Sequence, residues 1–180
     1  MKGCMAIDRQ KTETVHWHAV FTASRAEKKV RDRLEELGVE CFLPVQTVLR
    51  QWTYRKSRVV VPVIAGLVFV RVSRQEQVKV LQTKGVVAFL RLKGEAGAAV
   101  IPDKQMEDFR FLLDFSEEAV EMTNENIKAG DLVRVVKGSL RGMEGELIRH
   151  KGVTKVLVRI DMLGCAMVNI PASFVEKLNK

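Results

Sequence analysis

Apolar residues near the start of the chain alternate between strand-like and helix-like spacing. Residues 17–21 form a short apolar run that predicts a strand. The sequence Ser24-Arg25-Ala26-Glu27 that follows matches a capping box, in which a hydroxyl and a carboxylate satisfy backbone donors at the start of a helix. That helix is predicted by apolar residues at helical spacing, namely Val30, Leu34 and Leu37. Gly38 supplies a left-handed end, so the pattern predicts a strand followed by a helix.

The same order of elements repeats further along the chain. A β-branched run over residues 59–72 predicts a buried strand, which leads into a second capping box at Ser73-Arg74-Gln75-Glu76. Residues 86–92 predict another strand, and Ile101-Pro102-Asp103 opens a third helix. An extended strand over residues 41–52 lies between the two strand–helix units. Two such units that share one sheet predict a small α+β sandwich.

The last part of the chain has a different pattern. Short apolar strands at regular spacing are predicted at residues 133–136, 146–150, 155–160 and 166–170. Glycine-containing turns separate them, at residues 138–142, 151–152 and 163–164. About 50 residues with this pattern predict an SH3-like β-barrel.

A polar, acidic stretch that begins at Ser116 separates the two patterns. It has no sustained apolar period, which is typical of an interdomain linker. We therefore expect four segments: an N-terminal tail at residues 1–15, a first domain at 16–115, a linker at 116–128 and a barrel at 129–180.

Charge adds a class of partner to this outline. The 180 residues carry a formal net charge of +8, with no acidic residue between Glu40 and Glu76, whereas residues 95–126 are acidic. A basic excess of this kind serves solubility or attracts a polyanion, and its clustering favours the polyanion. The longest apolar run, residues 59–70, is far shorter than the roughly 20 residues of a membrane span, so no membrane association is expected.

Catalytic and metal-binding patterns are not found in the sequence. Cys4, Cys41 and Cys165 are far apart and form no CxxC pair, which argues against a disulfide scaffold or a zinc site and favours a reducing cytosol. The histidines are His16, His18 and His150, without partners at triad or metal-ligand spacing. The first 15 residues lack the apolar core of a signal peptide. We expect a cytoplasmic, monomeric protein that is not an enzyme and needs no metal or cofactor.

The two domains together resemble a NusG-type transcription elongation factor, in which an NGN domain precedes a KOW module. The N-terminal resemblance lies in the opening strand at Trp17, the Glu27-Lys28-Lys29-Val30 helix start and the strand around Gly66-Leu67-Val68-Phe69-Val70. The KOW resemblance lies in Gly130-Asp131-Leu132-Val133-Arg134-Val135, followed by the turn glycines Gly138, Gly142 and Gly145. It covers residues 17 to 178.

Two segments look closer to the specialised RfaH-like and UpxY-like antiterminators, of which the latter serve capsular polysaccharide operons. These segments are Phe42-Leu43-Pro44-Val45 and the loop from Leu90-Arg91 to Val100-Ile101-Pro102. The resemblance implies processive elongation or antitermination of specific operons. It implies binding to the β′ clamp helices of RNA polymerase and to the non-template DNA strand, and recruitment of Rho or a small-subunit ribosomal protein through the KOW module.

The resemblance also implies an apolar docking face for the polymerase. The matching positions are Ile64, Leu67, Phe69, Phe89 and Ile101. Because side chains alternate along a strand, Leu67 and Phe69 share one face, and we expect one face of the sheet to be presented outward. Core packing is the alternative for these residues. A charge at Leu67 is expected to abolish polymerase binding with little change in melting temperature.

Nucleic-acid contact is predicted at two basic segments. Arg25, Lys29 and Arg33 stand at i, i+4 and i+8, and Lys84 could join them; a solvated helix face is the alternative. The second segment interleaves aromatic and cationic side chains, in Trp52, Tyr54, Arg55 and Lys56. That composition suits base stacking with phosphate pairing, and equally suits an exposed hairpin tip. An RNA- or ribosome-binding KOW protein without polymerase affinity is the competing function.

Overall fold

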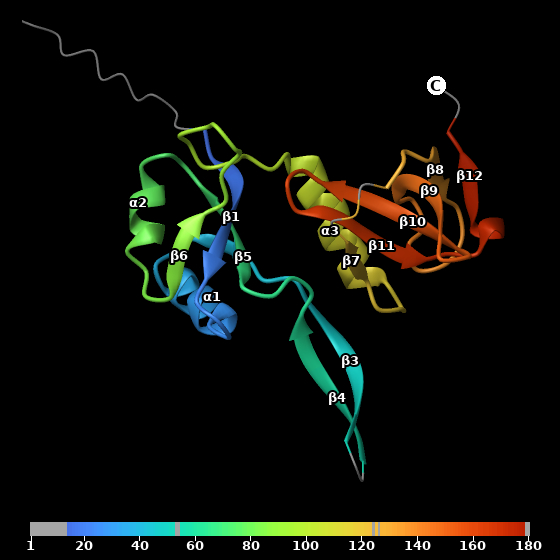
Figure 1. The fold of residues 1–180 in the computed structure, drawn as a ribbon, viewed down its shortest axis with the longest axis horizontal. Helices are drawn as coiled ribbons and strands as arrows, with labels where there is room; N and C mark the ends of the chain where they lie inside the picture. Colours follow the sequence, from blue (N-terminus) through green and yellow to red (C-terminus); the bar gives the residue numbers. More distant parts are fainter. Residues whose placement is uncertain (1–13, 53–54, 124, 126, 179–180) are drawn as a thin grey trace, which may run out of the picture.

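The structure is a computed structural model that describes residues 14–52, 55–123, 125 and 127–178. It contains an N-terminal domain with a sheet and three helices, a C-terminal barrel, and a two-stranded hairpin that projects away from both (Figure 1). The predicted α+β class and the small barrel are confirmed.

The N-terminal domain is built on a four-stranded antiparallel sheet with the order β2-β5-β1-β6. The strands are β1 (His16–Thr22), β2 (Glu40–Phe42), β5 (Leu67–Val72) and β6 (Val86–Phe89). The helices are α1 (Glu27–Glu36), α2 (Glu76–Leu81) and α3 (Asp103–Phe115).

Helices cover both faces of this sheet. Val68 and Val70 of β5 lie in a buried cluster with Val30 of α1 and Val80 of α2. Leu67 and Phe69 point the other way and lie in a cluster that includes Met106 and Phe109 of α3. The expectation that one face is presented outward is therefore wrong, because α3 occupies the second face.

The long apolar run of residues 59–72 is two strands rather than one. β4 (Arg55–Pro62) pairs with β3 (Val45–Trp52) in a separate two-stranded sheet, and β5 begins only at Leu67. Gly66 lies between them with φ +73°, a left-handed conformation that glycine adopts without a steric penalty. The predicted strand over residues 41–52 is likewise divided, into β2 and β3.

The two predicted capping boxes differ in outcome. The N–H of Ser73 donates to Glu76 Oε2 at 2.8 Å and the N–H of Glu76 donates to Ser73 Oγ at 3.4 Å, which is the reciprocal pattern expected. The first box does not form: Ala26 caps α1 without a side-chain hydrogen bond. Glu27 Oε1 instead accepts from the N–H of Gly66 at 2.7 Å, so its carboxylate joins α1 to the turn before β5.

The C-terminal domain is one six-stranded antiparallel sheet with the order β12-β8-β9-β10-β11-β7. Its strands are β7 (Glu121–Thr123), β8 (Asp131–Val135), β9 (Glu144–His150), β10 (Val153–Ile160), β11 (Gly164–Asn169) and β12 (Val175–Lys177), with a 3₁₀ turn, η1 (Ala172–Phe174), before the last.

Part of the segment expected to be a linker belongs to this sheet. β7 pairs with β11, with Cys165 opposite Thr123 and Met167 opposite Glu121. Lys155 Nζ donates to Glu121 Oε2 at 2.7 Å and ties β7 to β10 as well. The connection between the domains is therefore centred on residues 116–120 in this structure.

The two domains are packed together through α3. One continuous apolar cluster runs from Phe69 on the sheet, through Phe109 on α3, to Val158 and Ile160 on β10. Figure 1 shows α3 between the N-terminal sheet and the barrel. The backbone N–H of Asp161, at the end of β10, donates to Gln105 Oε1 of α3 at 2.8 Å.

Candidate functional site

An open apolar groove of about 400 Å³ lies between the two domains. Its N-terminal wall contains Phe21 at the end of β1, Ile64 in the turn before β5, and Leu90 after β6. Its other wall comes from the barrel, with Met122 of β7 and Leu163 in the turn before β11. The groove brings together apolar side chains that lie far apart in the sequence.

The structure separates the five residues predicted to bind the polymerase. Ile64 is half-buried and Leu67 is 2% exposed, and both line the groove. Phe69 and Ile101 are buried beneath α3. Phe89 lies in the cluster on the opposite face of the sheet, so it shares no surface with the other four.

Two groove residues were not identified from the sequence. Phe21 is 42% exposed although it lies on a strand whose neighbours are buried, and Leu90 is half-buried. Trp17 and Ala19 of β1 lie in the cluster with α3. Phe21 is two residues further along, so the period of the strand predicts that it lies on the same face. Trp17 and Ala19 are buried, so the exposure on this face of β1 begins at Phe21.

A cation holds α3 against the sheet beside this groove. The guanidinium of Arg110 lies 4.6 Å from the ring centroid of Trp17 and 4.7 Å from that of Phe42. Glu40 approaches both Arg110, at 3.9 Å, and Arg71, at 3.5 Å. These contacts join α3 to Trp17 on the interior strand β1 and to Phe42 and Glu40 on the edge strand β2. α3 is therefore attached to the N-terminal domain by aromatic and ionic contacts as well as by its apolar face.

The first basic segment forms a surface around the end of α2. Arg33 Nη1 donates to the carbonyl oxygen of Lys84 at 2.6 Å, which brings Lys84 beside α1. Lys29 and Lys84 are exposed. Arg25 precedes the helix, with φ 58°, so the predicted i, i+4, i+8 row on one helix is wrong at its first member. Arg33 has a structural role that the sequence did not indicate.

The second basic segment lies at the outer end of the β3–β4 hairpin. Trp52 and Arg55 are opposite each other in the backbone register, and Lys56 is exposed. The prediction for Tyr54 lies outside the described residues. The hairpin therefore carries the predicted cationic segment away from both domains (Figure 1).

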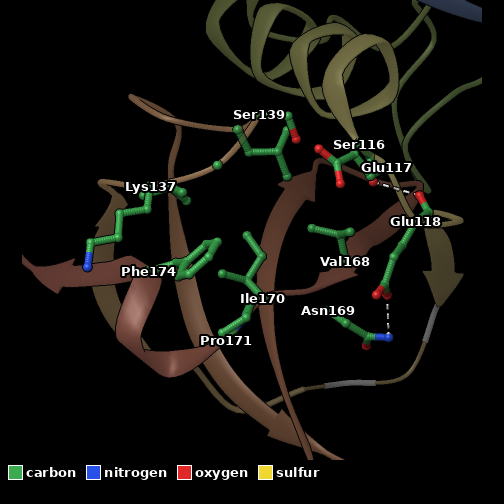
Figure 2. A pocket seen from close by; sticks show the side chains of 13 residues that line it. Ser116, Glu117, Glu118, Lys137, Ser139, Val168, Asn169, Ile170, Pro171 and Phe174 are labelled. Atoms are coloured by element: carbon green, nitrogen blue, oxygen red, sulfur yellow. Dashed lines mark hydrogen bonds between the residues drawn. The ribbon is translucent and has the colours of Figure 1, made fainter.

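The barrel presents a second pocket, of about 250 Å³, next to the end of α3. Its apolar floor is formed by Val168, Ile170 and Phe174, and Glu118 lies at its rim, where Asn169 Nδ2 donates to Glu118 Oε2 at 2.8 Å (Figure 2). The predicted turn glycine Gly138, with φ +83°, packs against Phe174.

The other predicted turn glycines have different structural reasons. Gly142 has φ +93°. A Cβ at Gly145 would lie 2.7 Å from Val156 Cγ1 and 2.9 Å from the carbonyl oxygen of Leu157, so any side chain there would displace β10. The first glycine is required by backbone conformation and the second by close strand packing.

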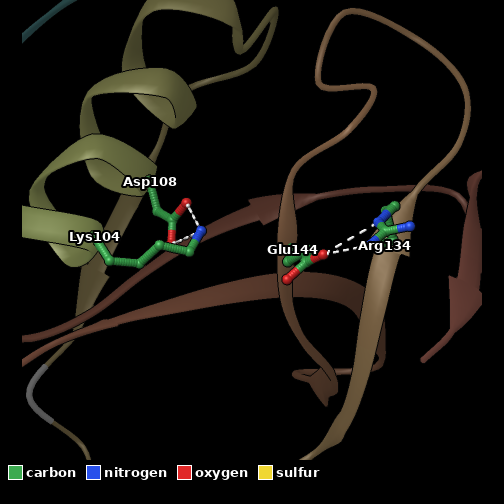
Figure 3. Close-up of polar contacts among 4 residues, drawn as sticks. All are labelled: Lys104, Asp108, Arg134 and Glu144. Atoms are coloured by element: carbon green, nitrogen blue, oxygen red, sulfur yellow. Dashed lines mark hydrogen bonds and ion pairs between the residues drawn. The ribbon is translucent and has the colours of Figure 1, made fainter. Parts of the chain in front are cut away.

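Charged pairs occur on α3 and on the part of the barrel nearest to it. Lys104 Nζ donates to Asp108 Oδ1 at 2.8 Å, and Arg134 Nη2 donates to Glu144 Oε1 at 2.6 Å (Figure 3). The hydrogen bond from Arg134 lowers the pKa of Glu144, and the charge of Lys104 contributes in the same direction. The positive charge of Lys104 on α3 thus favours the ionised form of Glu144 on the barrel.

Burial shifts the pKa of two side chains outside the groove, His18 and Cys41. His18 is 3% exposed; its Nδ1 lies 2.7 Å from the carbonyl oxygen of Ala99, and burial lowers the pKa of the imidazole. Burial raises the pKa of the Cys41 thiol to about 11, which leaves little thiolate at neutral pH. Across the described part of the chain, no three His, Cys, Asp or Glu residues are grouped closely enough to hold a metal ion.

Comparison with known proteins identifies the class. The family model NusG, described as transcription termination factor nusG, matches residues 15–110, which is more than half of the 180-residue chain. The chain belongs to the NusG family of transcription factors. No curated protein sequence matches it.

One solved structure extends the similarity in fold to both domains. A structure of Thermotoga maritima NusG, titled for its domain interaction, has 22% sequence identity and a TM-score of 0.50, and the match covers 92% of this chain and 98% of that one. The MjSpt4:Spt5 complex in conformation B has 18% identity and a TM-score of 0.29, with 91% of this chain and 97% of that one covered. None of the helices in the described residues combines the length and apolar character that crossing a membrane requires.

Proposed function

We propose that this chain binds RNA polymerase during elongation through the interdomain groove and promotes processive elongation or antitermination of particular operons. The observation that carries the proposal is the apolar groove at Ile64 and Leu67, in a chain of the NusG family. Two of the five positions assigned by resemblance line it, and Phe21 adds an aromatic side chain that is 42% exposed. An aromatic anchor in an apolar recess is a common centre of binding energy at a protein interface.

The barrel limits access to this groove in the present arrangement. Met122 and Leu163 face Ile64 and Phe21 across it, so a polymerase helix that contacts Ile64 needs the barrel to move aside. We propose that this movement exposes the groove while α3 stays on the sheet, held by Arg110 between Trp17 and Phe42. The released barrel would recruit a second protein, Rho or a small-subunit ribosomal protein.

Basic residues near α1 would contact the non-template DNA strand. Arg25, Lys29 and Lys84 are exposed and lie on or next to one corner of the domain. Arg33 is left out of the DNA-contacting set because its guanidinium is engaged with the Lys84 carbonyl. Cross-linking to the non-template strand should be lost in an Arg25→Ala, Lys29→Ala, Lys84→Ala variant that keeps the wild-type melting temperature.

Retention of purified core polymerase by the full chain tests the proposal. Ile64→Ser should weaken retention, because it removes apolar contact from the groove without placing a charge in a core. Val87→Ser is the control: Val87 is 64% exposed on β6 and is not among the residues that line the groove. Equal retention by both variants would contradict the groove as the docking site. Binding to ribosomal RNA with no retention of polymerase would favour the competing KOW function.

Transcription in vitro tests the outcome of binding. The protein should reduce pausing or Rho-dependent termination on a template that carries its operon leader, and should have no effect on an unrelated template. The proposed operon class, including capsular polysaccharide operons, rests on the resemblance in residues 42–45 and 90–102. An equal effect on every template would instead favour a general elongation role without operon preference. We propose a cytoplasmic location with either role.

A further inference from the structure

The β3–β4 hairpin has two faces that differ sharply in exposure. Residues opposite each other in the register share a face, and the pairs Thr47–Val60, Leu49–Arg58 and Gln51–Lys56 form the first. All six are exposed. The second face contains Gln46, Val48, Ser57, Val59 and Val61, which are all half-buried, together with exposed Arg50. We call the first the outer face.

The outer face exposes apolar side chains next to cationic ones. Leu49 is 70% exposed and stands opposite Arg58 near the middle of the hairpin. Lys56 and Arg58 are two residues apart on one strand, so they point the same way with roughly 7 Å between them. Gln51 opposite Lys56 adds an amide that can both donate and accept.

Three cations of the hairpin have no acidic partner within the described part of the chain. No ion pair joins a carboxylate to Arg50, Lys56 or Arg58 anywhere in the described ranges 14–52, 55–123, 125 and 127–178. The sequence between Glu40 and Glu76 contains no acidic residue. These exposed cations are therefore available to an anionic partner.

Shape restricts the kind of polyanion. Each strand has eight residues, so the ribbon is roughly 25 Å long. The hairpin projects from the domain (Figure 1), and the residues of its outer face are exposed. The major groove of B-form DNA is about 12 Å wide and admits a two-stranded β-ribbon, whereas that of A-form RNA is too narrow for side chains to read.

We propose that the outer face of the β3–β4 ribbon binds duplex DNA in its major groove, with Lys56 and Arg58 on phosphate or guanine and Leu49 against apolar base edges. This inference goes beyond the binding to polymerase and to the non-template strand proposed above. The groove, α1 and the barrel have no part in it.

Direct binding of the full chain to DNA tests the proposal without polymerase, so its failure is distinguishable from failure of the polymerase proposal. The probes are a short B-form duplex, one of its strands alone, and an RNA duplex of the same sequence, followed by fluorescence anisotropy at several salt concentrations. We expect the DNA duplex to bind tightest. Arg58→Ala should weaken that binding about tenfold and reduce the slope of log K against log salt by about 1.

Arg50→Ala is the matched control, because it removes the same charge from the same hairpin on the other face. It should leave duplex affinity close to wild type. An equal loss from Arg50→Ala and Arg58→Ala would overturn the face-specific proposal in favour of general charge attraction. Single-stranded DNA bound as tightly as the duplex, or no binding of the duplex, would overturn it as well. Unchanged melting temperatures verify that the exposed substitutions leave the fold intact.

Discussion

Gln105 of α3 accepts a hydrogen bond from the backbone N–H of Asp161, 2.8 Å away at the end of β10. This contact is a polar link between the N-terminal domain and the barrel beside their shared apolar cluster. Lys104, the neighbour of Gln105, contributes to the lowered pKa of Glu144 on the barrel. The barrel is thus positioned on α3 by a directional hydrogen bond in addition to apolar packing.

Replacing Gln105 should shift the domains toward separation. Gln105→Ala removes a hydrogen bond with a net contribution of about 1 kcal/mol, which raises the population of separated domains several-fold. Small-angle scattering should show a larger radius of gyration, and polymerase retention should increase. Glu107→Ala, at an exposed position on the same helix, is the control. A Gln105→Ala protein with unchanged dimensions and polymerase affinity would contradict this role.

Arg110 should stabilise the N-terminal domain through its planar guanidinium. Arg110→Met retains much of the apolar contact but loses the cation over Trp17 and Phe42 and the approach to Glu40, which predicts a loss of about 1 to 2 kcal/mol in urea unfolding. Arg110→Lys should recover only part of it, because an ammonium cannot stack between two rings. Full recovery by lysine would show that charge alone matters.

Leu67 should behave as a core residue in any stability measurement. It is 2% exposed and packs in the α3 cluster, so Leu67→Ala is expected to cost about 2 to 5 kcal/mol. Leu67→Glu should be worse, since a carboxylate would be buried without a partner. Thermal melts should therefore show a large drop. A charged variant that melts near wild type would restore the sequence-based expectation of an exposed position.

Sequence periodicity predicted the strands and helices of this fold better than it predicted which segments pack against them. The alternation along residues 67–70 gave the correct division of side chains between two faces, because strand period is a local property. It could not reveal that α3 covers the second face, since that depends on packing between segments far apart in the chain. The same limit applies to Phe89, which belongs to the correct strand but the opposite face from Leu67.

Local signals also failed where a distant group competed for the same side chain. The capping box at Ser24 is correct in composition, yet Glu27 bonds the N–H of Gly66 instead. The box at Ser73 has no such competitor and forms as predicted. The sequence predicts one strand over residues 59–72, because β-branched residues with high strand propensity lie on both sides of Gly66. The structure has a turn at Gly66 that divides this segment.

Stability should decline in mildly acidic solution because of His18. Burial lowers the pKa of this imidazole in the folded protein, whereas in the unfolded chain it is near 6.5. Near and below about pH 6.5 the unfolded state therefore binds more protons than the folded state. The free energy of unfolding decreases as the pH is lowered through this range. Urea midpoints measured from pH 7 to 5 should decrease.

A non-titrating residue at position 18 should remove most of this dependence. His18→Gln keeps a donor for the Ala99 carbonyl but has no proton to gain, so its midpoints should be nearly constant over the same range. The exposed neighbour His16 provides the comparison. Its charge is the smallest cause of the lowered pKa of His18, after burial, so His16→Gln should retain most of the wild-type slope. A wild-type slope in the His18→Gln protein would assign the effect to another group.

Glu146 should be the most important carboxylate of the barrel. Arg159 donates to its two oxygens at 2.6 and 2.9 Å, and the N–H of Gly130 donates to Oε2 at 3.1 Å. Arg159 also donates to the carbonyl oxygen of Ile127 at 3.1 Å, so the pair fastens the start of the barrel to β9 and β10. The hydrogen bond from Arg159 holds the pKa of Glu146 below its usual range.

Glu146→Gln should therefore lower the free energy of unfolding by about 1 to 3 kcal/mol. Glu144→Gln is the control, because Arg134 donates only to Oε1 of Glu144, and this pair lies at the surface. Solvent screens exposed pairs of this kind, so a clearly smaller loss is expected. The contribution of Glu146 is present above its unfolded pKa, near 4.5, and is lost as pH falls through the lower folded pKa. The difference between wild type and Glu146→Gln should thus be constant at neutral pH and shrink only below about pH 4.5. Equal losses of unfolding free energy from the two substitutions would contradict this role. They would show that the hydrogen bonds from Gly130 to Glu146 and from Arg159 to Ile127 add nothing to the ion pair.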